Sequence, residues 1–172
     1  MTSPEANPVA YLALGGNVGD VRESFDYARK RLAEATGRPV RASRLYRTAP
    51  WGESDQPDFL NMVVEIQWNQ SPRDLLDLAL SIEHECGRNR SREKRWGPRT
   101  LDIDLLVFGS AMIADTDLSI PHPRMKERTF VLAPLSDLAP DLIPPGWSRT
   151  VLQVLAERSD CDTAVPLDSP SP

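Results

Sequence analysis

Residues 9–35 read VAYLALGGNVGDVRESFDYARKRLAEA, and this stretch sets the start of the fold. The apolar run at 9–14 predicts a buried strand, which Gly15 and Gly16 end. Asp20 can cap a helix that follows, because apolar residues then recur on one face at helical spacing. These residues are Val21, Phe25, Ala28, Leu32 and Ala35. The chain therefore opens with a strand, a tight turn and a helix.

The rest of the chain predicts a single α+β domain, in which helices pack on an antiparallel sheet. Further strands are expected at 40–47, 62–68 and 101–108, and further helices at 72–86, 124–133 and 151–156. Ser71, Pro72 and Asp74 form a typical helix start. The polar, proline-rich stretch 159–172 predicts a disordered tail, so the folded domain is expected to span 1–158.

Composition excludes several classes of protein. The net charge is −5, which argues against bulk binding of nucleic acid. No apolar run approaches the length of about 18 residues that a membrane span needs. The start of the chain, MTSPEANP, lacks the basic and apolar parts of a secretion signal. Cys86 and Cys161 do not make a disulfide framework, so we expect a cytoplasmic protein.

The segment Leu101-Asp102-Ile103-Asp104-Leu105 places two carboxylates on one face of a strand and the apolar side chains on the other. Neighbouring like charges repel, so such a pair indicates a cation or a basic partner that neutralises it. Carboxylates without a nearby His or Cys suit Mg²⁺ that is bound together with phosphates. The alternative is an edge strand whose outer face meets only water.

Directly before this strand, residues 88–99 hold six Arg or Lys residues against a single acid, Glu93. Arginines present planar pairs of donors that match phosphate oxygens and can stabilise charge in phosphoryl transfer. Basic and acidic groups side by side therefore indicate a site for Mg²⁺ and a polyphosphate. The alternatives are a solvated charged turn and a contact with RNA, in which Trp96 would interleave with the arginines.

Other segments carry side chains of the kind that ligand sites use. An aromatic ring and an amide, such as Phe59 and Asn61 provide, suit a flat heterocycle. By themselves, Phe59 fits the core and Asn61 fits a turn equally well. His122 lies between two prolines on a rigid segment and is followed by Arg124, Lys126 and Arg128, so it could donate to phosphate or have a purely structural role. Phe130 could belong to the core or stack on a ring.

Five motifs follow one another along the chain: ALGGNVGD (13–20), LYRTAP (45–50), DQPDFLN (55–61), RWGPRTLDID (95–104) and PHPR (121–124). In this order they resemble the 6-hydroxymethyl-7,8-dihydropterin pyrophosphokinase family of folate biosynthesis, over about residues 9–145. The motif at 95–104 is the most specific. The resemblance implies a ferredoxin-like α+β fold. It also implies transfer of the diphosphate of ATP to the pterin hydroxymethyl oxygen, with release of AMP.

The resemblance also implies the site. Asp102 and Asp104 would hold two Mg²⁺ ions. The pterin would contact Thr48, Trp51, Phe59, Asn61, Trp96 and Phe130, and ATP would contact Glu83, Arg88, Arg90, Arg99, His122 and Arg128. Within this set, Arg88, Arg99 and Asp104 would be catalytic. The implied protein is a monomer that acts on ATP and a pterin, without nucleic acid or membrane. Gly16 departs from the family, which usually has Ser there.

Two rival functions remain open at this point. A nucleic-acid-binding module would use residues 88–99, and its affinity would fall steeply with added salt. A metal-dependent nucleotidyl or glycosyl transferase would also use an Asp-x-Asp pair to hold a nucleotide diphosphate. The products formed from ATP separate these rivals from a pyrophosphokinase.

Overall fold

Strand β1 (Val9–Gly16) lies between β4 (Phe59–Gln67) and β5 (Asp102–Phe108) and is antiparallel to both. The sheet continues from β4 through β3 (Tyr46–Thr48) to β8 (Val165–Pro166). β2 (Arg41–Ala42) pairs with another part of β4, which completes a six-stranded sheet. A separate pair consists of β6 (Ile113–Ala114) and β7 (Ser119–Ile120).

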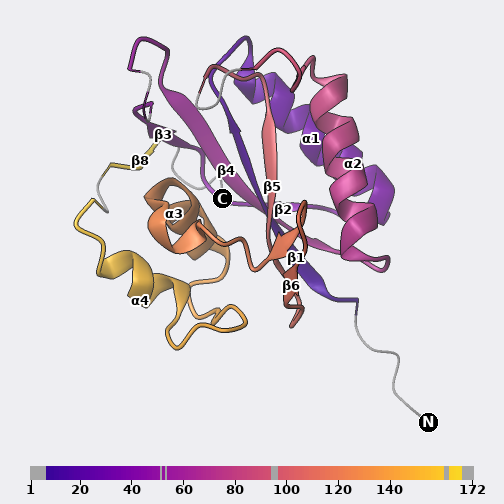
Figure 1. Ribbon diagram of the computed structural model, residues 1–172, viewed down its shortest axis with the longest axis vertical. Coiled ribbons are helices and arrows are strands. Elements are labelled where there is room, and N and C mark those ends of the chain that lie inside the picture. The colour runs from indigo at the N-terminus through magenta and orange to yellow at the C-terminus, as the bar shows by residue number, and fades with distance from the viewer. Residues whose placement is uncertain (1–6, 51, 53, 94–96, 161–162, 168–172) are drawn as a thin grey trace.

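The computed structural model describes residues 7–50, 52, 54–93, 97–160 and 163–167. Within this part of the chain, helices cover both faces of the antiparallel sheet (Figure 1), so the expected α+β class is confirmed. No helix in these ranges is long and apolar enough to cross a membrane.

Helices α1 (Val21–Thr36) and α2 (Pro72–Glu85) pack on one face of the sheet (Figure 1). The side chain of Asp20 accepts a hydrogen bond from the Glu23 N–H, and Ser71 and Asp74 form a reciprocal capping box, as the sequence predicts. The core beneath these helices is fully buried. It includes Leu12, Phe25, Leu32, Leu75 and Ile82.

The other face of the sheet carries the short 3₁₀ helix η1 (Met125–Glu127), α3 (Thr129–Leu138) and α4 (Val151–Ala156). A second core forms there from Val63, Leu106, Leu132, Leu135 and Val151. α3 packs on β4 and β3 on this face of the sheet (Figure 1).

The structure corrects two expected elements. The strand expected at 40–47 is broken, because the Ser43 hydroxyl accepts from the Val63 N–H and the Arg44 side chain turns to Asp137 of α3. The helix expected at 124–133 begins only at Thr129 and runs to Leu138, after the turn of η1. The helix capped by Thr150 ends at Ala156, as predicted.

Part of the tail that the sequence predicts to be disordered, residues 159–160 and 163–167, is described by the structure, and it packs on the sheet. Val165 and Pro166 form β8 on the edge strand β3, and the Leu167 N–H donates to the Leu45 carbonyl at 2.8 Å. Ala164 is buried beside Tyr46 and Ala133. The open edge of β3 gives this polar segment backbone partners, which its composition alone does not reveal.

Candidate active site

A cavity of about 360 Å³ opens where β1 ends and β4 and β5 begin, on the α3 side of the sheet. Its floor comes from β1, β4 and β5, and its walls from residues 48–50, the start of α3 and the C-terminal segment. Eight of the residues expected at the site line it: Thr48, Phe59, Asn61, Arg99, Asp102, Asp104, Arg128 and Phe130.

The register of the sheet places residues of β4, β1 and β5 side by side on the floor of the cavity. Gly15 of β1 pairs with Asn61 of β4 on one side and with Asp102 of β5 on the other. Paired residues on antiparallel strands point to the same face, so the amide and the carboxylate flank the bare backbone of Gly15. Two strand spacings separate their backbones by about 10 Å. Ala13, two residues away, pairs with Asp104 in the same manner.

Asp102 and Asp104 face the cavity, while Leu101, Ile103 and Leu105 are buried in the core under α1 and α2. The predicted division of this strand into an apolar and an acidic face is therefore confirmed. β5 is an edge strand, as the alternative interpretation requires, but its acidic face meets arginines as well as water.

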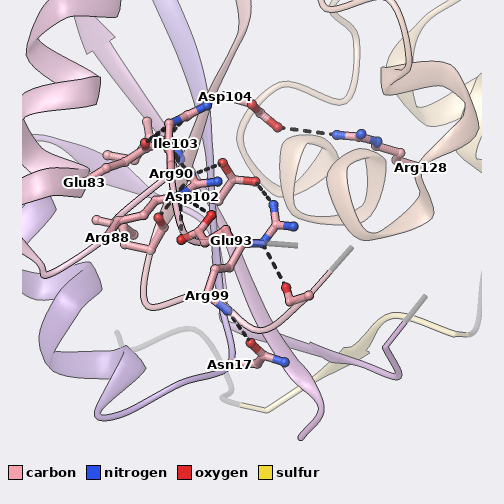
Figure 2. Close-up of polar contacts among 12 residues, drawn as sticks. Asn17, Glu83, Arg88, Arg90, Glu93, Arg99, Asp102, Ile103, Asp104 and Arg128 are labelled. Atoms are coloured by element: carbon pink, nitrogen blue, oxygen red, sulfur yellow. Dashed lines mark hydrogen bonds and ion pairs between the residues drawn. The ribbon is translucent and has the colours of Figure 1, made fainter. Parts of the chain in front are cut away.

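Asp102 is held by two arginines (Figure 2). Arg88 Nη1 donates to Oδ1 at 2.6 Å, and Arg99 Nη1 donates to Oδ2 at 2.9 Å. Burial raises the pKa of Asp102, but the positive charges of Arg88 and Arg99 outweigh it and hold the pKa below its usual value. Asp102 is therefore a carboxylate at neutral pH.

Asp104 has a weaker set of partners. Arg128 Nη1 lies 3.4 Å from its Oδ2 (Figure 2), and His122 Nε2 lies 3.9 Å from the same oxygen. Burial and the neighbouring charge of Asp102 raise the pKa of Asp104. Burial and Arg128 lower the pKa of His122 to about 4, so the imidazole is neutral. Its Nδ1 accepts from the Arg124 N–H, which leaves the proton on Nε2, facing Asp104.

Glu83 lies beneath this cluster and is only 1% exposed. Its carboxylate accepts from the Ile103 N–H at 2.8 Å and forms ion pairs with Arg88 at 3.0 Å and Arg90 at 2.8 Å (Figure 2). Burial raises the pKa of Glu83, although the Ile103 N–H and the arginines oppose that shift. Glu83 does not line the cavity, so the geometry does not favour the direct contact with ATP that the resemblance implies.

Arg99 connects the basic segment to the turn after β1. Its backbone N–H donates to Asn17 Oδ1 at 3.0 Å, and its carbonyl accepts from the N–H groups of Asn17 and Val18 (Figure 2). Asn17 in turn donates to Gln56 and to the Pro57 carbonyl. A buried asparagine thus joins three of the motifs that lie far apart in the sequence.

On the β4 side of the cavity, Asn61 Nδ2 donates to Thr48 Oγ1 at 2.8 Å, and both residues are buried. This bond leaves the Asn61 carbonyl oxygen and its second N–H for a ligand. Phe59 and Phe130 also line the cavity, and the Arg128 guanidinium lies 5.7 Å from the centre of the Phe130 ring. The arrangement suits a flat, polar heterocycle.

The other expected site residues that the structure describes do not line the cavity. Arg88 is 8% exposed and lies behind Asp102; Arg90 and His122 lie nearby. Trp51 and Trp96 fall outside the described residues. The cavity wall also includes residues that the sequence interpretation does not assign to the site, among them Arg124, Thr129, Asp160 and Thr163. Only Arg124 carries a signal in the sequence, as part of the motif PHPR.

Within the described ranges, no group of three or more His, Cys, Asp and Glu residues is arranged to hold a metal ion. A magnesium ion that is bound together with substrate phosphates needs only one or two carboxylates from the protein. The oxygen ligands of Asp102 and Asp104 therefore fit Mg²⁺, and they do not form a structural zinc or calcium site.

Comparison with known proteins agrees with these motifs. The model of the family 7,8-dihydro-6-hydroxymethylpterin-pyrophosphokinase matches residues 11–140. Several bacteria have proteins that are similar to this chain and are named 2-amino-4-hydroxy-6-hydroxymethyldihydropteridine pyrophosphokinase. The one from Methylorubrum extorquens is 46% identical over 86% of this chain and 92% of its own length. That from Bacillus subtilis is 48% identical over 77% of this chain and 78% of its own length.

The fold is also similar to solved structures of longer proteins. The chain superimposes on Plasmodium falciparum HPPK-DHPS A437G with pteroate with a TM-score of 0.66 at 16% identity, and the match covers 88% of this chain. The chain spans only 43% of that longer protein. This likeness supports the fold alone. From the family match and the bacterial relatives, the chain belongs to the 7,8-dihydro-6-hydroxymethylpterin-pyrophosphokinase family.

Proposed function

We propose that this chain transfers the diphosphate of ATP to the hydroxymethyl oxygen of 6-hydroxymethyl-7,8-dihydropterin and releases AMP. The observation that carries the proposal is the row Asn61–Gly15–Asp102 on the cavity floor. At one end of this row, the Asn61 amide can hydrogen-bond to a heterocycle. At the other end lies the acidic pair Asp102 and Asp104, which arginines flank. The name that the bacterial relatives share supports the same reaction.

In this reaction the hydroxymethyl oxygen attacks the β-phosphorus of ATP. The bond between that phosphorus and the oxygen that leads to the α-phosphate breaks, and AMP departs with the electron pair. We assign Asn61, Phe59 and Phe130 to the pterin ring, because all three line the cavity and offer an amide and two aromatic rings. Thr48 fixes the Asn61 amide. The positions assigned to Trp51 and Trp96 rest on the resemblance.

Asp102 and Asp104 would hold two Mg²⁺ ions, which neutralise phosphate charge and lower the pKa of the attacking hydroxyl when bound. Arg99 and Arg128 line the same cavity and can stabilise charge on the phosphoryl oxygens and on the departing AMP. Asp104 is also the candidate acceptor of the hydroxyl proton, because its carboxylate lines the cavity beside Arg128.

Of the remaining residues of the expected site, Arg88 and Glu83 act through others in this proposal, whereas His122 and Arg90 can contact ATP themselves. Arg88 orients Asp102, and Glu83 holds both Arg88 and Arg90 against β5. The neutral His122 can donate from Nε2 to a phosphate oxygen or to Asp104. Arg90 could turn towards ATP, because its side chain is half-exposed.

Three finer statements also belong to the proposal. The order β5-β1-β4-β3, with α1 and α2 as crossovers on one face, supports a ferredoxin-like description. A monomer is sufficient, because a single chain supplies every residue assigned to the site. The free thiol of Cys86 suits the reducing cytoplasm.

The test is to incubate the protein with ATP, Mg²⁺ and 6-hydroxymethyl-7,8-dihydropterin and to identify the nucleotide product. AMP, formed in equal amount to pterin diphosphate, is the expected result. Formation of ADP would indicate transfer of a single phosphoryl group, and formation of pyrophosphate would indicate nucleotidyl transfer. Omission of the pterin should abolish AMP formation.

A further inference from the structure

The C-terminal segment, meaning residues 158–160 and 163–167, forms part of the cavity wall. Asp160 and Thr163 line the cavity together with Phe59 and Asn61. Beyond them, Ala164 is 6% exposed and packs beside Tyr46 and Ala133, and β8 pairs with β3. The segment is therefore held to the sheet just after it passes the cavity.

Asp160 connects this segment to the first turn of α3. Thr129 Oγ1 donates to Asp160 Oδ1 at 2.8 Å, and Arg158 donates from Nε to Oδ1 at 2.7 Å and from Nη2 to Oδ2 at 3.1 Å. Thr163 Oγ1 donates to the Asp160 carbonyl at 2.7 Å. Arg158 Nε also donates to Thr129 Oγ1 at 3.0 Å, and Thr129 is only 3% exposed, so its hydroxyl is held between Arg158 and Asp160.

Thr129 is placed where its position affects ligand binding. It directly precedes Phe130, which we assign to the pterin ring, and it lies on the cavity wall itself. No side chain caps the start of α3. The bond from Thr129 to Asp160 therefore ties the first turn of α3, which carries Phe130, to the C-terminal segment.

We propose that Asp160 is a positioning residue for the pterin: it holds the C-terminal segment and Thr129 together as the wall against which the ring is seated. This inference rests on the proposed function. The segment joins the sheet at β3, beside Thr48, while Asp102 and Asp104 lie on β5 at the opposite edge. Arg128, which we assign to the phosphates, directly precedes Thr129, but its guanidinium is paired with Asp104 of β5 at 3.4 Å. Loss of the Asp160 contacts should therefore affect the pterin more than ATP.

The experiment compares Asp160→Ala, Asp160→Asn and Thr129→Val with the wild-type full-length chain. Calorimetry with 6-hydroxymethylpterin measures pterin affinity directly, and steady-state kinetics gives KM for the pterin and for ATP. Asp160→Ala should weaken pterin binding about tenfold, since it removes charge-assisted hydrogen bonds, and should change KM for ATP less than twofold. Asp160→Asn keeps the shape and an acceptor, so it should recover much of the affinity.

The matched control is Asp117→Ala, which removes another aspartate that receives two donors from an arginine, Arg73, away from the cavity. It should leave both KM values unchanged. Equal pterin affinity in wild type and Asp160→Ala, or equal losses for pterin and ATP, would overturn the inference. If wild type itself forms no AMP, the proposed function fails instead, and pterin affinity still reports on Asp160 separately. Thermal unfolding of each variant confirms that the compared proteins are folded.

Discussion

Arg88 Nη1 lies 2.6 Å from Asp102 Oδ1 and 3.0 Å from Glu83 Oε1, so one buried guanidinium joins an acid of the cavity to an acid of the core. Its Nε also pairs with Glu93 at 3.0 Å. Removal of one acid therefore leaves Arg88 with partners. This arrangement separates the contribution of Asp102 to activity from its contribution to stability.

Asp102→Asn and Asp104→Asn should each fold normally and lose turnover. We expect a loss of about 100-fold or more, since metal coordination contributes several kcal/mol to the stabilisation of transition-state charge. Single-turnover assays with Mg²⁺ give the rate, and circular dichroism checks the fold. Turnover near the wild-type level in either variant would contradict the metal role.

Arg99→Ala should slow the transfer step more than it weakens ATP binding. An arginine that stabilises transition-state charge is worth about 10³ to 10⁵ in rate in the GTPase cases. Arg99→Lys is the control, because it keeps the charge but loses the planar pair of donors. Single-turnover kinetics and calorimetry with ATP measure the two effects, and equal losses in both would exclude a transition-state role.

Glu83→Ala should destabilise the fold strongly, because it leaves Arg88 and the Ile103 N–H short of a buried acceptor. Loss of one partner from a buried ion pair costs about 3–5 kcal/mol. Glu83→Gln keeps an acceptor for Ile103 and should cost less. The free energy of unfolding in urea measures both. If Glu83→Ala had a small effect on stability and a large effect on KM for ATP, that result would support the direct contact between Glu83 and ATP that the resemblance implies.

Glu85 should contribute stability that depends on pH. Hydrogen bonds from Arg31 and Tyr27 of α1 lower the pKa of this α2 residue to about 2. Because the pKa of Glu85 is lower in the folded chain than in the unfolded chain, its carboxylate stabilises the fold at pH values above the ordinary pKa of 4.5. This contribution is lost as the pH falls towards 2. Glu85→Gln should therefore be less stable by about 1 kcal/mol or less at neutral pH. The difference from wild type should shrink on acidification, and a growing difference would refute this assignment.

Gly15 and Gly16 form a matched pair with different expected outcomes. A methyl group on Gly15 would lie 3.3 Å from Asn61 Oδ1, so Gly15→Ala should raise KM for the pterin with little loss of stability. A methyl group on Gly16 would lie 2.6 Å from the Thr100 carbonyl oxygen, so Gly16→Ala should shift the backbone next to Arg99 and lower both stability and turnover. Thermal unfolding and steady-state kinetics of both variants test this contrast.

The sequence predicts well those parts of the site that depend on local pattern. The alternation around Asp102 and Asp104 predicts their shared face, and the capping signals at Asp20 and Ser71 predict two helix starts. These features follow from backbone periodicity and need no knowledge of the rest of the chain.

The parts that the sequence does not predict depend on distant partners. The resemblance assigns Glu83 to ATP, but its helical position does not predict that β5 places the Ile103 N–H, 20 positions away, against its buried carboxylate. The tail reads as disordered until β3 offers an open edge to Val165. Both outcomes are set by tertiary contacts that override local composition.

The pairing of Gly15 with both Asn61 and Asp102 has a consequence for substrate choice. The strands cannot separate without breaking the hydrogen bonds between them, so the distance between the Asn61 amide and the Asp102 carboxylate is fixed. A pterin that carries a hydroxyethyl group in place of the hydroxymethyl group would still fit its ring into the cavity. Its hydroxyl group, however, would lie beyond the position set by Asp102 and Asp104. Such a compound should occupy the protein as an inhibitor and not as a substrate.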